Sequence, residues 1–158
     1  MTESATSSEL DDFDRAILRL VQQNNQLSHG EIAEQVNLSP SSVRRRLKRL
    51  RETGVIEADV SIVQPKGRVA EVVVLVTFGT ESVEAVRDFR QRMRDAPEVA
   101  QVYSVAGNVD FVLLVQAEDL ESYEAWGERN LMADPNIQRY DSHVVWSRVK
   151  YSTALHSL

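Results

Sequence analysis

The sequence contains no cysteine, and its three histidines, His29, His143 and His156, lie far apart. Without cysteine no disulfide or thiolate metal site can form, and this composition is typical of a reducing cytoplasm. The histidine spacing does not fit a metal site, so we expect no metal and no cofactor. No apolar run approaches the roughly 20 residues of a membrane helix. Residues 1–9 have no basic or apolar stretch like that of a signal peptide, so we expect a cytoplasmic protein.

Lysine is scarce, with 3 lysines beside 15 arginines, and the acidic excess gives a formal net charge of −6. This charge is unevenly distributed, because residues 1–36 carry −5, residues 37–51 carry +6 and residues 52–158 carry −7. The positive segment reads NLSPSSVRRRLKRLR and contains no acidic residue. Concentrated positive charge in an acidic chain predicts a polyanionic partner for this segment.

The residues just before the positive segment predict a short helix and a turn. Ser28 and Glu31 have the spacing of a capping box, and an amphipathic helix of about two turns follows them. Asn37-Leu38 predicts a tight turn. Ser39 is a favourable N-cap for the next helix, and Pro40 suits its first position. Two helices joined in this way, the second one basic, are a helix-turn-helix.

The positive segment itself has a helical pattern, because Val43, Leu47 and Leu50 recur at i, i+4 and i+7 and share one face. The helix is expected to end near Thr53, where Gly54 can adopt the left-handed conformation that follows many helices. A basic helix face is often only solvated surface. The prediction of double-stranded DNA as partner therefore rests on the capping box, the turn, the Ser39-Pro40 start, the apolar face and the positive charge taken together. The expected DNA-binding residues are Ser39, Ser41, Ser42, Arg44, Arg45, Arg46, Lys48 and Arg49.

The rest of the chain alternates between helix and strand patterns. A further helix is expected from Asp11, and β-branched or apolar runs predict strands at 71–79, 99–105, 111–117 and 137–151, with helices at 82–95 and 120–132. The order βαββαβ is that of a ferredoxin-like α+β domain with two helices on one face of an antiparallel sheet. The predicted parts are a disordered tail at 1–9, a DNA-binding headpiece at 10–54, a linker at 55–69, the ferredoxin-like domain at 70–151 and a C-terminal tail at 152–158.

The strand runs VVVLVTF and DFVLLVQ are apolar on both sides of the pleat. Two helices can cover only one face of the sheet, so a monomer would expose a large apolar patch on the other. A homodimer that packs sheet against sheet removes this patch and supplies two recognition helices for paired half-sites.

The two modules together resemble the Lrp/AsnC family of feast/famine transcriptional regulators. The headpiece fits the family patterns L-D-x-x-D-x-x-I-L from Leu10 to Leu18, E-[IL]-A from Glu31 to Ala33 and L-S-x-S-x-V from Leu38 to Val43. The family's G-x-x-D stands at Gly107-Asn108-Val109-Asp110. The resemblance covers about residues 10–151. It implies a DNA-binding regulator that dimerises through its C-terminal sheets and often forms larger oligomers of dimers.

The resemblance also implies a site for a free amino acid at an interface between dimers, partly on the G-x-x-D hairpin. Asp110 can hold an α-ammonium group and loop N–H groups an α-carboxylate, although Gly107-Asn108 is also ordinary hairpin chemistry and Asp110 could simply tie the turn. Tyr140 and Ser142 replace the family's T-x-T, and the tyrosine would fill part of the cleft. The expected effector residues are Ser104, Ala106, Gly107, Asn108, Asp110, Tyr140 and Ser142.

Two other functions fit the same sequence. An architectural protein of this fold would wrap DNA as an oligomer without any effector. An enzyme or metabolic sensor built on the ferredoxin-like half is less favoured, because the sequence shows no nucleophile–base pair, metal cluster or phosphate-binding glycine loop. We therefore expect a regulator without enzymatic activity that responds to a small amino-acid-like effector.

Overall fold

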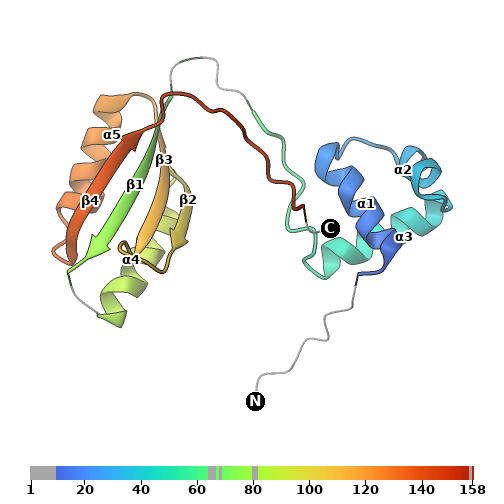
Figure 1. The fold of residues 1–158 in the computed structure, drawn as a ribbon, viewed down its shortest axis with the longest axis horizontal. Helices are drawn as coiled ribbons and strands as arrows, with labels where there is room; N and C mark the ends of the chain where they lie inside the picture. The colour runs from blue at the N-terminus through green and yellow to red at the C-terminus, as the bar shows by residue number, and fades with distance from the viewer. Residues whose placement is uncertain (1–9, 64–66, 68, 80–81, 157) are drawn as a thin grey trace. The chain divides into compact units, whose positions relative to one another are not determined.

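The computed structural model describes residues 10–63, 67, 69–79, 82–156 and 158 (Figure 1). The tail expected to be disordered, residues 1–9, lies outside this described part. The chain divides into two compact units, one within Met1–Ile62 and Lys150–Leu158 and the other within Val63–Val149. In the described part, none of the helices combines the length and apolar character needed to cross a membrane.

The first unit contains three helices, α1 (Asp12–Gln23), α2 (His29–Val36) and α3 (Pro40–Glu52). The predicted caps are present, since Ser28 and Glu31 form a capping box on α2 and Ser39 caps α3. The turn between α2 and α3 contains Asn37 in the left-handed conformation. Its amide side chain makes this conformation less costly than it is for most residues. The predicted helix-turn-helix is confirmed.

Apolar side chains from all three helices form one core in this unit. Ile17 of α1, Ile32 and Val36 of α2, and Val43 and Leu47 of α3 are all buried in it. The pattern at i, i+4 and i+7 in α3 thus faces its two neighbours, as the sequence predicts. The opposite side of α3 is thereby directed away from the core.

The C-terminal segment belongs to the same unit. Leu155 N–H donates to Gln22 Oε1 at 2.6 Å, and Arg19 Nη1 donates to the carbonyl of Leu158 at 3.1 Å. Both contacts are made to α1. They are exposed polar contacts, each of which contributes little to stability by itself.

The second unit is a four-stranded antiparallel sheet with helical segments, in the predicted order βαββαβ. Its strand order is β2-β3-β1-β4, so β2 and β4 are the two edges. The elements are β1 (Ala70–Phe78), α4 (Val83–Asp95), β2 (Val99–Ser104), β3 (Phe111–Ala117), α5 (Leu120–Gly127), the π-helix η1 (Glu128–Met132) and β4 (Ile137–Val144).

Two expected elements differ from those observed. The helix predicted at 120–132 changes at Glu128 into the π-helix η1, which apolar periodicity does not anticipate because its stripe continues through Leu131. The last strand was expected to extend to Tyr151, but β4 ends at Val144. After Val144, the backbone N–H of Val145 still donates to Glu71 O at 2.8 Å, and the Arg148 side chain pairs with the carboxylate of Glu71, but these contacts do not continue the strand. Apolar residues beyond that point have no ladder to join.

One face of the sheet packs against the helices and carries the core of this unit. Val72, Val74, Val76 and Leu113 are fully buried there, and the core also includes Phe89 and Met93 of α4, Trp126 of α5 and Leu131 of η1. The rings of Phe78, Phe89 and Phe111 lie against one another, with centroids 4.9–5.7 Å apart. These contacts are in the range of favourable aromatic pairs.

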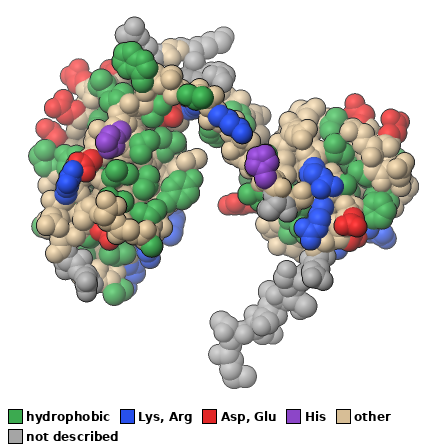
Figure 2. Space-filling view, viewed as in Figure 1, with side chains coloured by type: hydrophobic (Ala, Val, Ile, Leu, Met, Phe, Trp, Pro, Cys, Tyr) green, Lys and Arg blue, Asp and Glu red, His purple; other side chains and the backbone are tan. Residues whose placement is uncertain are grey.

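The other face of the sheet, which we call the open face, is not covered by α4 or α5 (Figure 1). Val73 and Leu75 of β1 lie beside Leu114 and Val112 of β3, and the register places Tyr103 of β2 next to Val112. These side chains are half-buried, except for Tyr103, which is 53% exposed. Figure 2 shows hydrophobic side chains gathered on this face. The expected apolar patch is therefore present on the single chain.

Candidate nucleic-acid interface and effector hairpin

Only part of the positive charge of α3 faces solvent. Arg44 and Arg45 are exposed and form no ion pair with any described residue, and Ser41 is exposed beside them. Lys48 is also exposed, and its Nζ lies 3.6 Å from Glu52 on the same helix. Such surface i,i+4 pairs are weak and easily exchanged for another anion. Ser41, Arg44, Arg45 and Lys48 therefore form the available polar surface of this helix, which we call the outer face of α3.

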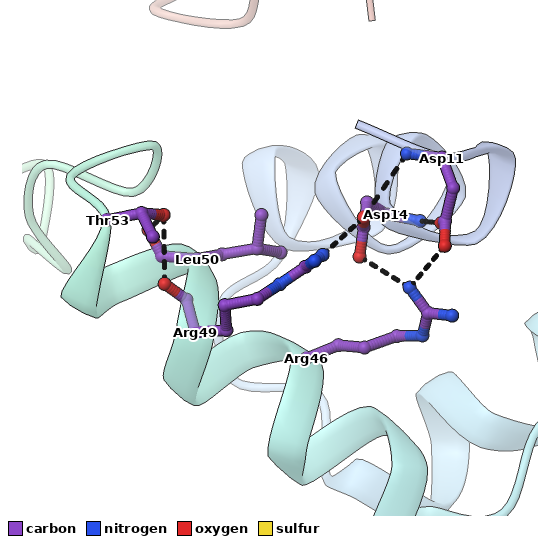
Figure 3. A network of polar contacts seen from close by, with 6 residues as sticks. All are labelled: Asp11, Asp14, Arg46, Arg49, Leu50 and Thr53. Carbon is purple, nitrogen blue, oxygen red and sulfur yellow. Dashed lines mark hydrogen bonds and ion pairs between the residues drawn. The ribbon is translucent and has the colours of Figure 1, made fainter. Parts of the chain in front are cut away.

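The other cations of α3 are held by carboxylates. Both side-chain oxygens of Asp14, a fully buried residue of α1, accept hydrogen bonds from arginines of α3 (Figure 3). Arg46 Nη1 lies 2.8 Å from Asp14 Oδ1 and 2.7 Å from Asp11 Oδ2, and Arg49 Nη2 donates to Asp14 Oδ2. These bonds, that to Asp11 first, raise the pKa of Arg46.

Two of the expected DNA-binding residues, Arg46 and Arg49, are thus placed differently from the sequence-based expectation. A helical wheel gives the direction of Cβ, whereas a guanidinium group lies several bonds further and can turn toward a neighbouring helix. Arg46 also lies with its guanidinium carbon 5.4 Å from the centre of the Phe13 ring. Both arginines join α3 to α1, and their charges are already paired with carboxylates of α1 and its N-cap.

The start of α3 carries a group of hydroxyls. Ser39 Oγ accepts from the N–H of Ser42 at 3.2 Å and lies within hydrogen-bond distance of the hydroxyls of Ser41 and Ser42, at 3.0 and 2.8 Å. The first backbone N–H groups of a helix favour anions. The three serines that are expected to contact DNA thus lie together at the N-terminus of α3, where an anion is favoured.

The carboxylates of Asp11 and Glu31 accept hydrogen bonds from backbone N–H groups at the N-termini of α1 and α2. The backbone N–H of Asp14 lowers the pKa of Asp11, and the backbone N–H of Ser28 lowers the pKa of Glu31. A carboxyl whose pKa is lower in the folded than in the unfolded chain contributes stability above its ordinary pKa. That contribution is lost as the pH falls through the lowered value, so both caps weaken in acid.

Asp110 connects the G-x-x-D hairpin to the end of β1. Its Oδ2 accepts from the backbone N–H of Phe78 at 2.7 Å, and its own N–H donates to the carbonyl of Val76 at 2.9 Å. Its carbonyl in turn accepts from the N–H of Val105. This geometry supports a turn-tying role for Asp110. Ala106, Gly107 and Asn108 are exposed at the tip of the hairpin, and no atom lies within 4 Å of a Cβ built on Gly107.

The expected effector residues do not come together within one chain. Ser104 lies on β2 and Tyr140 and Ser142 lie on β4, and these strands are at opposite edges of the sheet. Three strand spacings separate the edges, or roughly 14 Å. Tyr140 packs against the core, and Ser142 hydrogen-bonds the hydroxyl of Tyr123, whose pKa is raised by burial.

Two residues of these sites were missed by sequence reasoning. Asp14 was identified only as part of a family pattern, although an acid three residues after an N-cap is a signal for a capping box. Arg90 of α4 has no sequence signal, because its contacts are made across the fold. Its Nη2 donates to Ser104 Oγ at 3.0 Å, and its guanidinium carbon lies 5.7 Å from the centre of the Phe111 ring. Among the described residues, no group of three or more potential ligands could hold a metal ion.

The network around Asp14 predicts a specific loss of headpiece stability. Asp14→Ala should lower the free energy of unfolding of this unit by about 1–3 kcal/mol, less than for fully buried pairs because the arginines can regain water. Asp59→Ala is the matched control, since the Arg51–Asp59 pair is exposed on both sides and should contribute less than about 1 kcal/mol. Urea denaturation monitored by helical circular dichroism measures both. Equal losses for the two variants would contradict the role assigned to Asp14.

Comparison with known proteins agrees with this architecture. Residues 10–57 match a winged helix-turn-helix DNA-binding domain, and residues 71–155 match the Lrp/AsnC ligand binding domain. The chain is 44% identical to the HTH-type transcriptional regulator y4tD of Sinorhizobium fredii over 93% of its own length and 88% of that protein.

Two solved structures extend this likeness. An AsnC family transcriptional regulator from Agrobacterium tumefaciens is 30% identical, with a TM-score of 0.82 and coverage of 92% of this chain and 95% of that one. A transcriptional regulator from Neisseria meningitidis in complex with L-Met is 28% identical, with a TM-score of 0.84 and coverage of 93% and 96%. The family matches and the y4tD relative together span nearly the whole chain, which therefore belongs to the Lrp/AsnC family of transcriptional regulators, with a helix-turn-helix DNA-binding part followed by the family's ligand-binding domain.

Proposed function

We propose that this regulator contacts DNA through the outer face of α3 in two copies of the chain. The observation that carries the proposal is the placement of Arg44, Arg45 and Lys48 on the exposed side of a helix whose other side is fully packed. The recognition helix of a helix-turn-helix lies in the major groove and contacts base edges near its N-terminus. Arg45 and Ser41, in the first half of α3, fit base contacts, whereas Lys48 fits a phosphate contact.

The Asp14 network supports this arrangement, because it fixes the orientation of α3 on α1. The guanidinium groups of Arg46 and Arg49 are paired with Asp14. These two arginines therefore affect DNA binding by orienting α3 and not by contacting DNA themselves. The regulator acts without enzymatic chemistry, and a protein that works on DNA in this way is expected in the cytoplasm.

Arg45→Ala should weaken binding to a specific operator more than Arg51→Ala. Arg45 is exposed without an ion-pair partner, whereas Arg51 Nε is already 2.8 Å from Asp59. Loss of a bidentate base contact costs roughly 1–3 kcal/mol and relaxes the preference at one base position. Competition binding against a library of operator variants measures affinity and preference together. If Arg45→Ala retained the base preference of the wild type, Arg45 would not contact a base.

We also propose that the open face is the dimer interface. Val73, Leu75, Val112 and Leu114 form a contiguous apolar area on a sheet that α4 and α5 cover only on the reverse side. A second copy of the chain has the same apolar area, so a two-fold symmetric dimer can pack the open face of one copy against the open face of the other. Two copies would then carry two recognition helices to paired half-sites.

The substitution Leu75→Asp should convert this dimer into monomers. It places a charge at the centre of the open face, where pairing would bury it without a partner. Thr77→Asp, on the same strand and the same face but near the β1 terminus, should weaken the dimer less. Sedimentation equilibrium at several protein concentrations measures the dissociation constants. If Leu75→Asp remained as dimeric as the wild type while Thr77→Asp dissociated, the centre of the interface would lie elsewhere.

We further propose that a free amino acid binds at the G-x-x-D hairpin and changes DNA binding. The match of residues 71–155 to a ligand-binding domain and the L-Met complex of the Neisseria relative support an amino-acid effector. Tyr140 and Ser142 lie at the opposite sheet edge from Ser104, so a site that uses both sets is completed by another copy. An architectural protein without an effector is the alternative.

A thermal-shift screen of the twenty amino acids separates these two functions. An effector at 100 times its dissociation constant should stabilise the protein by roughly 2.7 kcal/mol, and the same compound should alter operator affinity. Asp110→Asn retains an acceptor for the N–H of Phe78, so it is expected to preserve the fold. If no amino acid shifts the unfolding temperature or the operator affinity, the architectural function is the correct one.

A further inference from the structure

Arg90 is held in a defined position beside the hairpin. Its guanidinium lies over the ring of Phe111, the first residue of β3, and donates to the hydroxyl of Ser104, the last residue of β2. Phe111 is itself fixed by its contacts with Phe78 and Phe89 in the core. A flexible side chain that is oriented from two directions has already lost part of the entropy that binding would otherwise cost.

The charge of Arg90 is not compensated by any described carboxylate. Of the other arginines of α4, Arg87 lies near Glu84 and Asp88 and Arg92 pairs with Asp134, whereas Arg94 donates to the neutral amide of Gln91. Arg90 has no carboxylate oxygen within 4.0 Å in the described part of the chain, although the protein has six more acidic than basic groups. A guanidinium has five N–H donors, and only one of those of Arg90 is used by Ser104.

The surroundings leave room for a small ligand to approach. Ala106, Gly107 and Asn108 are exposed, and no atom lies within 4 Å of a Cβ built on Gly107. Asp110, by contrast, already accepts a 2.7 Å hydrogen bond from Phe78. The residue that is both charged and available at this hairpin is therefore Arg90, which favours the anionic end of a ligand.

We propose that Arg90 binds the α-carboxylate of the amino-acid effector, with the Ser104 hydroxyl as a second donor. This assignment rests on the proposed effector function of the hairpin and adds the residue that recognises one end of the ligand. A planar guanidinium binds a carboxylate through two parallel N–H···O bonds, which makes it more selective than a lysine ammonium. The sequence pattern by itself indicates only loop N–H groups as donors to this carboxylate.

The test compares each of the twenty free amino acids with its methyl ester, which retains the ammonium group and lacks the carboxylate charge. Isothermal titration calorimetry is performed on the full chain as wild type, Arg90→Gln, Arg90→Lys and Arg94→Gln. Arg94 is the matched control, because it is exposed on the same helix four residues further. The far-ultraviolet circular dichroism and unfolding temperature of each variant are measured first.

The wild type and Arg94→Gln should bind the free effector on the order of 10- to 100-fold more tightly than its ester. Arg90→Gln should bind the free acid about as weakly as the ester, and Arg90→Lys should recover part of the difference. A wild type that binds no amino acid would defeat the effector function and this assignment together. A wild type that binds the acid and the ester equally, or an Arg90→Gln variant that binds the acid as tightly as the wild type, would overturn the assignment of Arg90 alone.

Discussion

Asp14 is the one charged residue that is fully buried in the described part of the chain, and guanidinium groups from α3 occupy both of its oxygens. A buried carboxylate is costly without such partners, so this contact makes the position of α3 strongly dependent on α1. Two arginines one turn apart bind this single carboxylate, which directs their guanidinium groups toward α1 and leaves Arg44, Arg45 and Lys48 on the outer face.

Pairing of arginines with acidic groups is also common in the second unit. In a chain with a net charge of −6, the described arginines Arg87, Arg92, Arg139 and Arg148 of this unit are paired with acidic groups, whereas Arg90, Arg94 and Arg129 are not. Among the described cations without a carboxylate partner, Arg44 and Arg45 lie on the outer face of α3 and Arg90 lies beside the hairpin, the two places where anions are expected to bind. Long-range repulsion by the remaining acidic surface is expected to keep DNA away from the rest of the protein.

Much of this fold could be predicted from the sequence because its signals are local. The capping box of Ser28 and Glu31, the Ser39-Pro40 helix start and the apolar runs of β1 and β3 each act within a few residues. The π-helix at Glu128 and the end of β4 at Val144 depend on tertiary packing and on the presence of a neighbouring strand, so periodicity does not reveal them.

The site residues show the same division. The exposed positions of Ser41, Arg44 and Arg45 follow from helix geometry, but the destination of a long side chain such as Arg49 does not. Asp14 lies 35 residues before Arg49, and Ser104 lies 14 residues after Arg90, so neither pair leaves a pattern in the sequence. The sequence is compatible with either a ligand-binding or a turn-tying role for Asp110, and its hydrogen bonds with Phe78, Val76 and Val105 in the structure support the second role.

The salt dependence of operator binding tests the central claim most directly, namely that only the outer face of α3 meets phosphate groups. An outer cation displaces about one condensed counterion whether it lies against a phosphate or, like Arg45, in the groove between phosphates, so the three outer cations of two helices are equivalent to about six neutralised phosphates and give a slope of log K against log salt near −5. If all six cations of each helix contacted DNA, about twelve phosphates would be neutralised and the slope would be near −11. A slope near −5 is the result that the structure predicts, and a slope near −11 would contradict the role of Asp14 in withholding Arg46 and Arg49 from DNA.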